Sequence, residues 1–532
     1  MLVPLLLAVA ATSARAQVAG IGASSVGLNI NFDLDVYSST LNNIVASVNE
    51  GPNRTCEDAV PVKKIYGVNF GNWLILEPWM SPTEWEAMQG QFAANGDCST
   101  VRQSEWSLST FLGQDATNAA FKKHWESWMT QADVDGIVAA KLNTVRLPLP
   151  FWIIEDIVDR THEPYAQGGL DELIRGLNMF NKAGLNVILD HHALPGVAAS
   201  GQMFAGNCTT LVEFYSSAST PLIPDYNYKR AVTWGIVMAF LSHAHPAFEK
   251  VFTIEGVNEP IQNAALTPGL GRFEVSYVLG IRAIELLMGI TCDATSPLTT
   301  TQVLTDDIAL PALIAAIPII TKLAIKYDLL AGASEFGWAA LLGSKGQLTP
   351  GKMGAFLGGR KRKCLSTQFM DQGWQYTGSP ANPADAAIGP QLYDNHIYFN
   401  FGGVAPNATE ESYMQTLCQI KTVATEVAAG NAPLYTGEWS IATAFNTTDA
   451  FLRQWGDAQK LTWSGTGSEA KSVGWVFWNW KVDQDARTYP ILGKYLQWSY
   501  RDALAAGLFT PDPADYFDEN VCVPYLNATG AA

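Results

Sequence analysis

The feature that most constrains this chain is a repeated alternation of short apolar runs with helix-like segments, which begins near Lys63. Such alternation is typical of βα units that build a parallel sheet. Helical periodicity is clear in Leu170–Ala183, where leucines recur at one face. The runs expected as strands are Ile65–Phe70, Thr144–Pro148, Val187–Asp190, Val251–Val257, about Leu365–Met370, Leu392–His396, Leu434–Thr436 and Gly474–Trp478. Eight strands with helices between them predict an α/β protein with a (β/α)8 (TIM) barrel.

The 532 residues would allow two or three domains, but one barrel with additions fits equally well. Residues 1–16 are expected to be a secretory signal peptide, with an apolar core and a small-x-small end at Ala14-Arg15-Ala16. Residues 17–62 are polar and are expected to form an N-terminal extension. The barrel then occupies 63–525. An insertion at about 262–390, between the fourth and sixth strands, is expected to be a helical subdomain or a long loop at the barrel mouth.

Several features favour export of a soluble protein. Seven cysteines lack Cys-x-x-Cys spacing, so we expect disulfides, with one thiol left over and with the connectivity open. No stretch after the signal is expected to span a membrane, because the aliphatic run Ala309–Ile320 is short and contains two prolines. A buried helix is expected there instead. Asn-x-Ser/Thr sequons, which are glycosylated only on a secretory route, begin at Asn53, Asn207, Asn407, Asn446 and Asn527.

The net charge of −17 argues against two classes of partner. Nucleic acids and anionic lipid surfaces both require a basic surface, which this chain does not offer. We therefore expect neither nucleic acid nor membrane as a partner, and a monomer is the default expectation.

Polar side chains follow the predicted strands, at the point where each strand ends. Because the carboxyl ends of barrel strands meet at one mouth, these side chains are expected to converge on a single pocket. They are Glu77, Arg146, Asp190-His191-His192, Asn258-Glu259, His396 with Tyr398, Glu438 and Trp478.

Two of these residues, Glu259 and Glu438, each end an apolar strand-like run. A single glutamate in such a place is about as often a solvated strand end as a functional group. Two carboxylates that face one cleft are what glycoside hydrolysis needs, one as proton donor and one as nucleophile or base. The pair, together with its polar partners, favours the catalytic interpretation.

Taken in order, the motifs resemble glycoside hydrolase family 5, and within it the fungal exo-β-1,3-glucanases. The resemblance extends from about Lys63 to Trp498, with most of the interval from Glu259 to Asp394 uncovered. The motifs are Gly67–Trp73, Leu76-Glu77-Pro78, Val145–Pro148, Asp190-His191-His192, Asn258-Glu259-Pro260, His396-Ile397-Tyr398, Gly437-Glu438-Trp439 and Gly474–Trp478.

The resemblance implies a retaining double displacement with Glu259 as acid/base and Glu438 as nucleophile. Retention requires carboxyl groups roughly 5 Å apart. The donor must hold a proton near the working pH, which burial and a neighbouring carboxylate favour. Glu438 must stay ionised, which Arg146 and the Tyr398 hydroxyl can favour by charge and hydrogen bonding.

The remaining site residues have roles that the resemblance implies. Asn258 would hold the sugar 2-hydroxyl, His192 and His396 would line the −1 sugar site, Trp478 would form its floor, and Glu77 would grip the terminal sugar. Simpler interpretations stay open. Arg146 could be a structural ion-pair partner, His192 could be a core histidine, and His191 is expected to be one or to point outward. Glu255 is expected to lie inside the barrel.

The chain departs from the family pattern in two places. Residues Ala193–Ala199 lack the usual Gly and Ser-Gln-Asn, and Asn72 replaces a more usual Gly. Both departures lie at the expected substrate rim and leave subsite preference open. By the same resemblance, Cys418 and Cys522 could form a disulfide that ties the C-terminus to a barrel helix.

These inferences predict a secreted, extracellular or wall-located retaining β-glucanase that prefers β-1,3-glucan and releases glucose from a chain end. Hydrolysis of β-1,6- or β-1,4-glucan and wall transglycosylation are alternatives within the family. A wall protein that binds glycan without catalysis is the alternative from another class. No metal or organic cofactor is expected, because no metal-ligand spacing occurs and this chemistry needs none.

Overall fold

The computed structural model describes residues 59–215, 225–288, 290, 300–329, 363–374, 381–465, 471–487 and 494–526. The predicted signal peptide and nearly all of the predicted N-terminal extension lie outside the described residues. So do two of the five sequon asparagines, Asn53 and Asn527.

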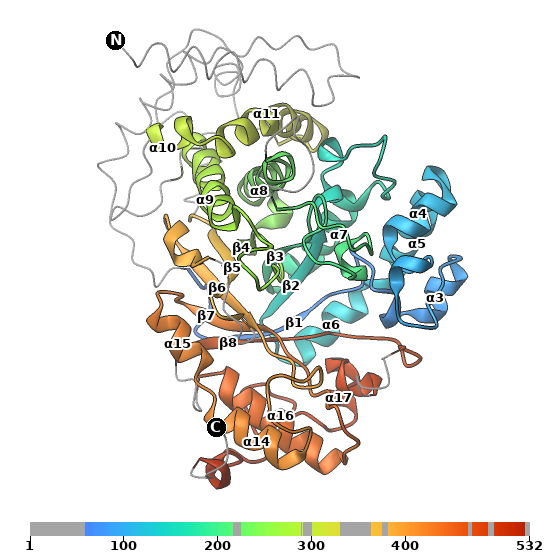
Figure 1. Cartoon of the computed structure of the whole chain (residues 1–532), viewed down its shortest axis with the longest axis vertical. Helices are drawn as coiled ribbons and strands as arrows, with labels where there is room; N and C mark the ends of the chain where they lie inside the picture. Colours follow the sequence, from blue (N-terminus) through green and yellow to red (C-terminus); the bar gives the residue numbers. More distant parts are fainter. Residues whose placement is uncertain are drawn as a thin grey trace.

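Eight parallel strands close into a barrel in which each strand pairs with its neighbours in sequence and β8 pairs with β1 (Figure 1). The (β/α)8 prediction is therefore confirmed. The strands are β1 Ile65–Asn69, β2 Thr144–Pro150, β3 Asn186–Ala193, β4 Val251–Glu255, β5 Ser366–Met370, β6 Gln391–His396, β7 Leu434–Glu438 and β8 Ser472–Phe477.

The carboxyl ends of all strands except β5 and β6 differ from those predicted by one to three residues, and two of these differences have a clear cause. β3 continues to Ala193 because, past a bulge, that residue still pairs with Pro150 of β2. β4 stops at Glu255 and not at Val257. Beyond Gly256 the chain turns towards β3, where the N–H of Asn258 bonds to the His191 carbonyl.

Helices surround the barrel, and the connection from β1 to β2 alone carries four of them. The helices are α3 Pro82–Ala87, α4 Glu105–Leu112, α5 Gln114–Trp128, α6 Gln131–Ala139, α7 Gly169–Ala183, α8 Tyr226–Ala244, α9 Leu270–Leu287, α10 Thr300–Thr305, α11 Ala309–Lys326, α14 Glu410–Gln419, α15 Thr422–Ala428, α16 Asp449–Trp463 and α17 Tyr500–Ala505.

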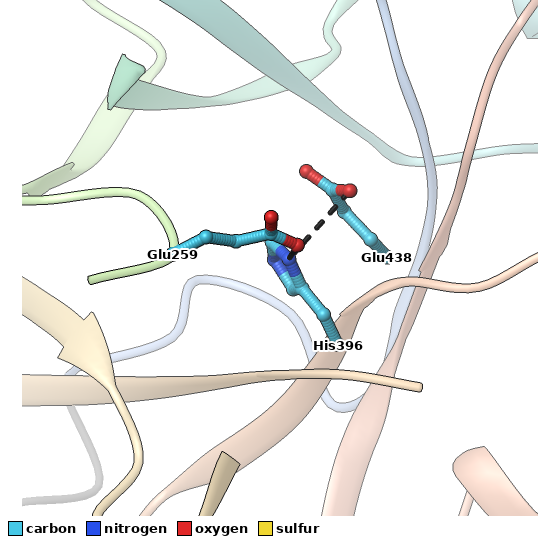
Figure 2. A group of neighbouring side chains, drawn as sticks. All are labelled: Glu259, His396 and Glu438. Atoms are coloured by element: carbon cyan, nitrogen blue, oxygen red, sulfur yellow. Dashed lines mark hydrogen bonds and ion pairs between the residues drawn. The ribbon is translucent and has the colours of Figure 1, made fainter. Parts of the chain in front are cut away.

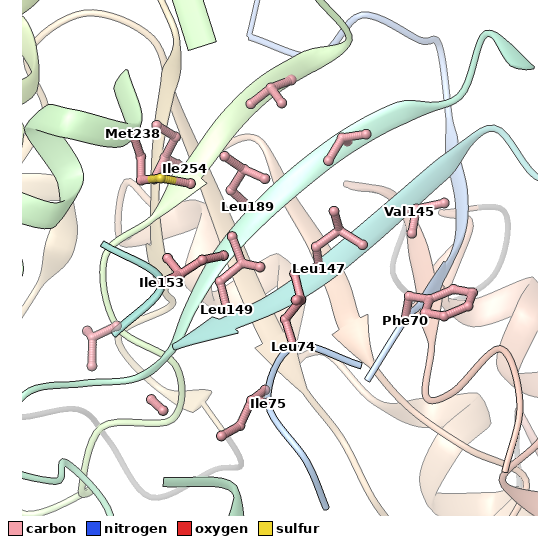
Figure 3. Close-up of a cluster of buried hydrophobic side chains, with 14 of the residues drawn as sticks. Phe70, Leu74, Ile75, Val145, Leu147, Leu149, Ile153, Leu189, Met238 and Ile254 are labelled. Atoms are coloured by element: carbon pink, nitrogen blue, oxygen red, sulfur yellow. The ribbon is translucent and has the colours of Figure 1, made fainter. Parts of the chain in front are cut away.

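The strand β2 contributes side chains both to the apolar core and to the barrel interior. Its seven residues are all buried, and successive side chains point to opposite faces. Val145, Leu147 and Leu149 join the apolar cluster between the strands and the helices, which also contains Met238 of α8 (Figure 3). Arg146 points the other way, into the barrel, where it meets side chains from four other strands.

The described part of the chain between β4 and β6 contains the helices α9, α10 and α11 and the barrel strand β5. α11 packs on α8 and α9, which separate it from the barrel strands (Figure 1). α8 and α9 lie close together at glycines, since a Cβ at Gly235 would lie 2.5 Å from the Tyr277 ring and one at Gly280 2.9 Å from Val232. The predicted range of about 262–390 thus also covers the barrel strand β5, and the form of the insertion stays a prediction.

The aliphatic run in the insertion is longer than we expected. The helix α11 extends to Lys326, and its 18 residues have a mean hydropathy of 1.7. Within the described residues it is the one helix long and apolar enough to cross a membrane by these two criteria. However, 56% of it is buried inside the protein, as in the core helix of a globular domain.

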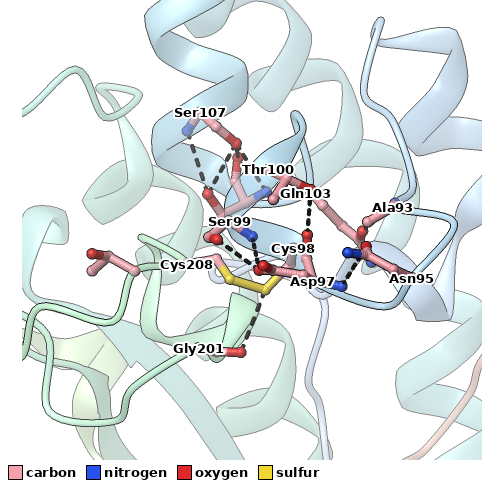
Figure 4. The surroundings of a disulfide bond; sticks show 12 residues. Ala93, Asn95, Asp97, Cys98, Ser99, Thr100, Gln103, Ser107, Gly201 and Cys208 are labelled. Carbon is pink, nitrogen blue, oxygen red and sulfur yellow. Dashed lines mark hydrogen bonds between the residues drawn. A yellow bond between two sulfur atoms is a disulfide. The ribbon is translucent and has the colours of Figure 1, made fainter.

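Two disulfides join described residues. Cys418 of α14 bonds to Cys522 near the C-terminus, which confirms the pairing implied by the resemblance. Cys98 bonds to Cys208, a pairing that the sequence left open (Figure 4). This second bridge links the connection after β1 to the connection after β3, both at the barrel mouth.

Candidate active site

The two glutamates singled out in the sequence lie side by side at the barrel mouth, with His396 between them (Figure 2). The His396 Nδ1 lies 2.8 Å from Glu259 Oε1 and 3.6 Å from Glu438 Oε2. One oxygen of each glutamate and this nitrogen all lie within 4.8 Å of one another. The two carboxylates are thus brought together from β4 and β7, 179 positions apart in the chain.

The surroundings of the two glutamates differ. Glu438 is the last residue of β7, and its side chain is 6% exposed. Glu259 lies in the connection after β4 with a positive φ of 42°, and its side chain is 20% exposed. One carboxylate is therefore fixed by the barrel wall, while the other is presented from a turn and faces solvent.

Arg146 connects Glu438 to the barrel interior. Its Nη1 donates to Glu438 Oε1 at 2.8 Å, and its Nη2 donates to Asn258 Oδ1 at 2.9 Å and to Glu255 Oε2 at 2.8 Å. The guanidinium also pairs with Asp190 Oδ2 at 3.1 Å. Arg146 is both a structural ion-pair partner and a direct neighbour of Glu438, so the two interpretations of this residue do not exclude each other.

Burial and neighbouring charges shift the pKa values of Glu438 and His396 in opposite directions. Burial raises the pKa of Glu438, while His396 and Arg146 oppose the shift by favouring the charged form. Burial alone would lower the pKa of His396, but the carboxylates of Glu438, Asp394 and Glu259 around it raise that pKa well above its usual range. A protonated His396 is therefore the natural bridge between the two glutamates.

Tyr398 and Asn258 lie next to the glutamates, as the sequence predicted. The Tyr398 hydroxyl donates to Glu438 Oε2 at 2.8 Å, so both oxygens of Glu438 accept a hydrogen bond. Asn258 accepts from Arg146 through Oδ1 at 2.9 Å. Its position directly before Glu259 places a hydrogen-bonding amide beside the carboxylate pair.

His192 and Trp478 form a stacked pair at the mouth. Their ring centroids lie 5.8 Å apart with planes at 13°. His192 Nδ1 is held by Asp190 Oδ2 at 2.7 Å. The neighbouring His191 is a core histidine, one of the two expectations for it: its ring stacks on Trp234 at 4.0 Å, and burial lowers its pKa to about 3.

Glu77 reaches the same mouth from the connection after β1. Trp79 Nε1 donates to Glu77 Oε2 at 2.9 Å, whereas the buried Oε1 has no hydrogen-bond partner in the described part of the chain. A Cβ at Gly71 would lie 3.0 Å from the Trp478 ring and 3.6 Å from Glu77 Oε1, so the carboxylate and the indole flank one glycine. Burial raises the pKa of Glu77 to about 7.

Several polar residues under the site were not singled out in the sequence. Asn69 Oδ1 accepts from Arg146 at 3.1 Å, and Gln368 Nε2 donates to Glu255 Oε2 at 3.0 Å. Asp394 accepts from the Tyr435 hydroxyl at 3.0 Å. The signal that could have found them is a polar residue at an inward-facing position of an otherwise apolar strand. Glu255, expected inside the barrel, does lie there and is fully buried.

One group of described residues has the donor types and spacing to hold a metal ion, and it is the set of Glu259, His396 and Glu438 itself. These atoms already contact one another, and Glu438 also bonds to Arg146 and Tyr398. These three residues are therefore placed as well to transfer protons among themselves as to bind a cation.

Comparisons with known proteins agree with this geometry. A family model described as cellulase (glycosyl hydrolase family 5) matches residues 111–484. The chain is 27% identical over 502 residues to a protein of Emericella nidulans named glucan endo-1,6-beta-glucosidase B, covering 92% of this chain and 95% of that protein. A shorter match, 37% over 132 residues, covers 25% of this chain and 29% of a probable glucan 1,3-beta-glucosidase A of Aspergillus fumigatus.

Solved structures resemble the fold. The rutinosidase from Aspergillus niger superposes with a TM-score of 0.51 at 15% identity, covering 84% of this chain and 98% of that one. At this identity the likeness concerns the barrel architecture alone.

Proposed function

The chain belongs to glycosyl hydrolase family 5, and from that premise we propose that it is a retaining β-glucan hydrolase in which Glu438 is the nucleophile and Glu259 the acid/base. The observation that carries this proposal is the convergence of the two carboxylates within 4.8 Å, with His396 between them. Retaining enzymes hold their carboxyl groups about 5 Å apart, whereas inverting enzymes need a wider gap for a water molecule.

The first step breaks the glycosidic bond. Glu438 attacks the anomeric carbon while Glu259 donates its proton to the leaving oxygen, which gives a covalent glycosyl–enzyme and a free sugar hydroxyl. In the second step Glu259, now a carboxylate, takes a proton from water. The resulting hydroxide attacks the anomeric carbon and releases Glu438, so the product keeps the starting configuration.

The neighbours of Glu438 favour this order of events. Arg146 and Tyr398 each donate a hydrogen bond to one of its oxygens, which stabilises the carboxylate before attack and after release. His396 contacts Glu259 and can exchange a proton with it. Asn258 is proposed to hold the sugar 2-hydroxyl, and His192, Trp478 and Glu77 to bind the sugar rings and hydroxyls around it.

For the linkage, β-1,6-glucan is the substrate that the relatives favour. Several relatives that match over more than 80% of this chain carry names of endo-1,6-beta-glucosidases. The match to a 1,3-beta-glucosidase covers only a quarter of this chain. β-1,3-Glucan, which the sequence motifs favour, is the second candidate because identity is higher over that shorter region.

Export to the cell exterior or wall is also proposed. The two disulfides between described residues suit an oxidising compartment. The sequon asparagines Asn407 and Asn446 are exposed and Asn207 is half-buried, so glycosylation is sterically open at the first two. Removal of N-glycans from the secreted protein should lower its apparent mass.

A product profile tests the proposal. Linear β-1,6-, β-1,3- and β-1,4-linked glucooligosaccharides are incubated with the enzyme, and the anomer first formed is recorded by NMR. We expect β-anomers and fastest cleavage of the β-1,6 series, with internal cleavage giving mixed lengths and end cleavage giving glucose. An α-anomer as first product would rule out retention, and preference for the β-1,3 series would restore the second candidate.

Transglycosylation and simple glycan binding would give different results in the same assay. Transglycosylation would give products longer than the substrate, because a sugar hydroxyl competes with water for the same intermediate. A glycan-binding protein without catalysis would show equal, negligible turnover for the wild type and for Glu438→Gln.

A further inference from the structure

We propose that Asn72 is a positioning residue for Glu77, which it holds at the barrel mouth by closing the base of the loop that carries it. This inference rests on the proposed function, in which Glu77 contacts the substrate. Asn72 is one of the two places where the sequence departs from its family's pattern, and no step of the proposed mechanism uses it.

The backbone at Asn72 takes a conformation that few side chains tolerate. Its φ is +57°, in the left-handed region that glycine enters freely and that asparagine enters more readily than most other residues. Glycine would therefore satisfy the backbone at this position. Asparagine adds an amide side chain to the same turn, and this side chain is completely buried.

The amide of Asn72 bonds to two points of one loop. Its Oδ1 accepts the backbone N–H of Glu77 at 2.8 Å, and its Nδ2 donates to Ser81 Oγ at 2.9 Å. Ser81 ends the loop where α3 begins. A single side chain thus connects the start, the middle and the end of residues 72–81, with Glu77 at the middle contact.

The backbone at Gly71 and Asn72 is held by hydrogen bonds from the helix α5. The Asn72 carbonyl accepts from His124 Nε2 at 2.6 Å, and the Gly71 carbonyl accepts from Trp128 Nε1 at 3.0 Å. Because a carbonyl only accepts, Nε2 of His124 carries a proton, and its Nδ1 faces Glu84 Oε2 at 2.8 Å. The helix α5 therefore fixes the turn from which the Asn72 side chain projects.

The position of Glu77 depends on few other contacts. The N–H of the preceding residue, Leu76, bonds to the buried Glu105 carboxyl at 2.7 Å, and Trp79 holds one oxygen of the Glu77 carboxylate. The other oxygen is buried and has no partner in the described part of the chain, so it is free to accept a sugar hydroxyl. The Glu77 carbonyl also accepts from the Met80 N–H at 2.9 Å. Loss of the Asn72 amide would therefore remove one of the two backbone hydrogen bonds of Glu77 while leaving its carboxylate intact.

The test is a double-mutant cycle with Asn72→Gly and Glu77→Ala. Asn72→Gly keeps the left-handed turn and removes both side-chain hydrogen bonds. We expect KM for the preferred oligosaccharide to rise about tenfold with kcat within about twofold, since contacts made equally in ground and transition states affect KM alone. In the Glu77→Ala background the same change should have no further effect on KM, because the two residues act through one contact.

The matched control is Gln89→Gly. Gln89 also has a positive φ, of 74°, but its side chain is exposed. Gln89→Gly shows how a glycine at a left-handed position changes the thermal midpoint by itself, and it should leave KM unaltered.

Each outcome has one meaning. If Asn72→Gly leaves KM unchanged while Glu77→Ala raises it, the positioning role is wrong and the proposed function stands. If the effects of the two substitutions on KM are additive, Asn72 acts by a route other than Glu77, and the inference is also wrong. If Glu77→Ala itself leaves KM unchanged, the substrate contact assigned to Glu77 under the proposed function fails.

Discussion

The inside of the barrel and the interfaces between α8, α9 and α11 are both buried, yet their chemistry differs. Inside, one guanidinium, that of Arg146, pairs with carboxylates from β3, β4, β6 and β7. In the outer layer, aliphatic side chains and close-packed glycines fill most of the space between helices, beside one small buried ion-pair group of His243, Arg282 and Glu285. The first region concentrates charge beneath the site, and the second supplies apolar burial.

The difference teaches where function and stability reside in this molecule. Charges inside the barrel are tolerated only as a paired set, so a change there should alter both folding and catalysis. A change in the outer layer should alter folding alone. Five substitutions test this separation, in order of decreasing effect.

Glu438→Gln should give the largest effect. The amide cannot attack the anomeric carbon, so we expect kcat to fall about 10⁴-fold or more, measured with the preferred oligosaccharide. The thermal midpoint should stay within a few degrees of the wild type, because the amide keeps the shape of the side chain. A variant that retains more than a tenth of the activity would exclude Glu438 as the nucleophile.

Arg146→Met should lower both the stability and the activity of the protein. It leaves Asp190, Glu255 and Asp394 without their cation in a buried site, so the free energy of unfolding should fall by about 3–5 kcal/mol in urea titrations. Activity should be lost as well. The control Lys326→Met breaks an exposed pair with Asp171 and should cost no more than about 1 kcal/mol.

Leu313→Ala probes the outer layer. Leu313 is fully buried in α11, and removing its side chain should lower the free energy of unfolding by about 3 kcal/mol. The kcat/KM of the folded variant should equal that of the wild type. Ile325→Ala on the same helix, where the side chain is 66% exposed, should change stability by about 0.5 kcal/mol or less. Loss of kcat/KM in Leu313→Ala would break the proposed separation.

Glu274→Gln tests an acid in the outer layer. Glu274 of α9 makes no ion pair within the described part of the chain, and burial raises its pKa from about 4.5 to about 8. Between these values the unfolded chain releases the proton and the folded chain keeps it, so the stability present at low pH is lost as pH rises.

From about pH 5 to about pH 7 this loss should amount to roughly 2 kcal/mol in the wild type. Glu274→Gln should remove that part of the pH dependence, as measured by urea midpoints at both pH values. The exposed Glu249→Gln serves as control and should leave the dependence unchanged. Equal slopes for the Glu274 variant and the wild type would mean that this acid is ionised in the folded protein.

Tyr398→Phe should give the smallest effect. It removes one of the two hydrogen bonds to Glu438 and no buried apolar area. We expect kcat/KM to fall about tenfold with an unchanged thermal midpoint, because hydrogen bonds to charged groups contribute about 1.5–3 kcal/mol. A fall in stability without a fall in kcat/KM would place this hydroxyl in a purely structural role.

The strands and the glutamate pair could be predicted because both leave local signals. An apolar run that ends in a carboxylate marks a strand end, as at Glu438, and eight apolar runs that alternate with helix-like segments predict closure into a barrel. The pairing of Cys418 with Cys522 followed from the resemblance. The common partners of Arg146 could not be predicted, because Asp190, Glu255 and Asp394 meet it only once four strands adopt their registers.

Other features depend on contacts between distant segments. The bridge between Cys98 and Cys208 joins residues 110 positions apart, and no spacing rule selects it from seven cysteines. The end of α11 at Lys326 could not be predicted because a proline normally limits a helix, whereas this helix accommodates Pro318 in its interior. The role of Asn72 has no local signal, since its bonds to Glu77 and Ser81 become visible only in three dimensions.

The bridge between Cys98 and Cys208 also makes the entrance asymmetric. It joins the connections after β1 and β3 covalently, so the side of the entrance that includes Glu77 and His192 is crosslinked. On the opposite side, the connection after β6 is also crosslinked, through Cys418 of α14, but its partner Cys522 lies in the segment after β8 and not in a neighbouring connection. Under the proposed function, we expect the β1–β3 side to be the rigid part of the entrance against which the sugar ring is placed.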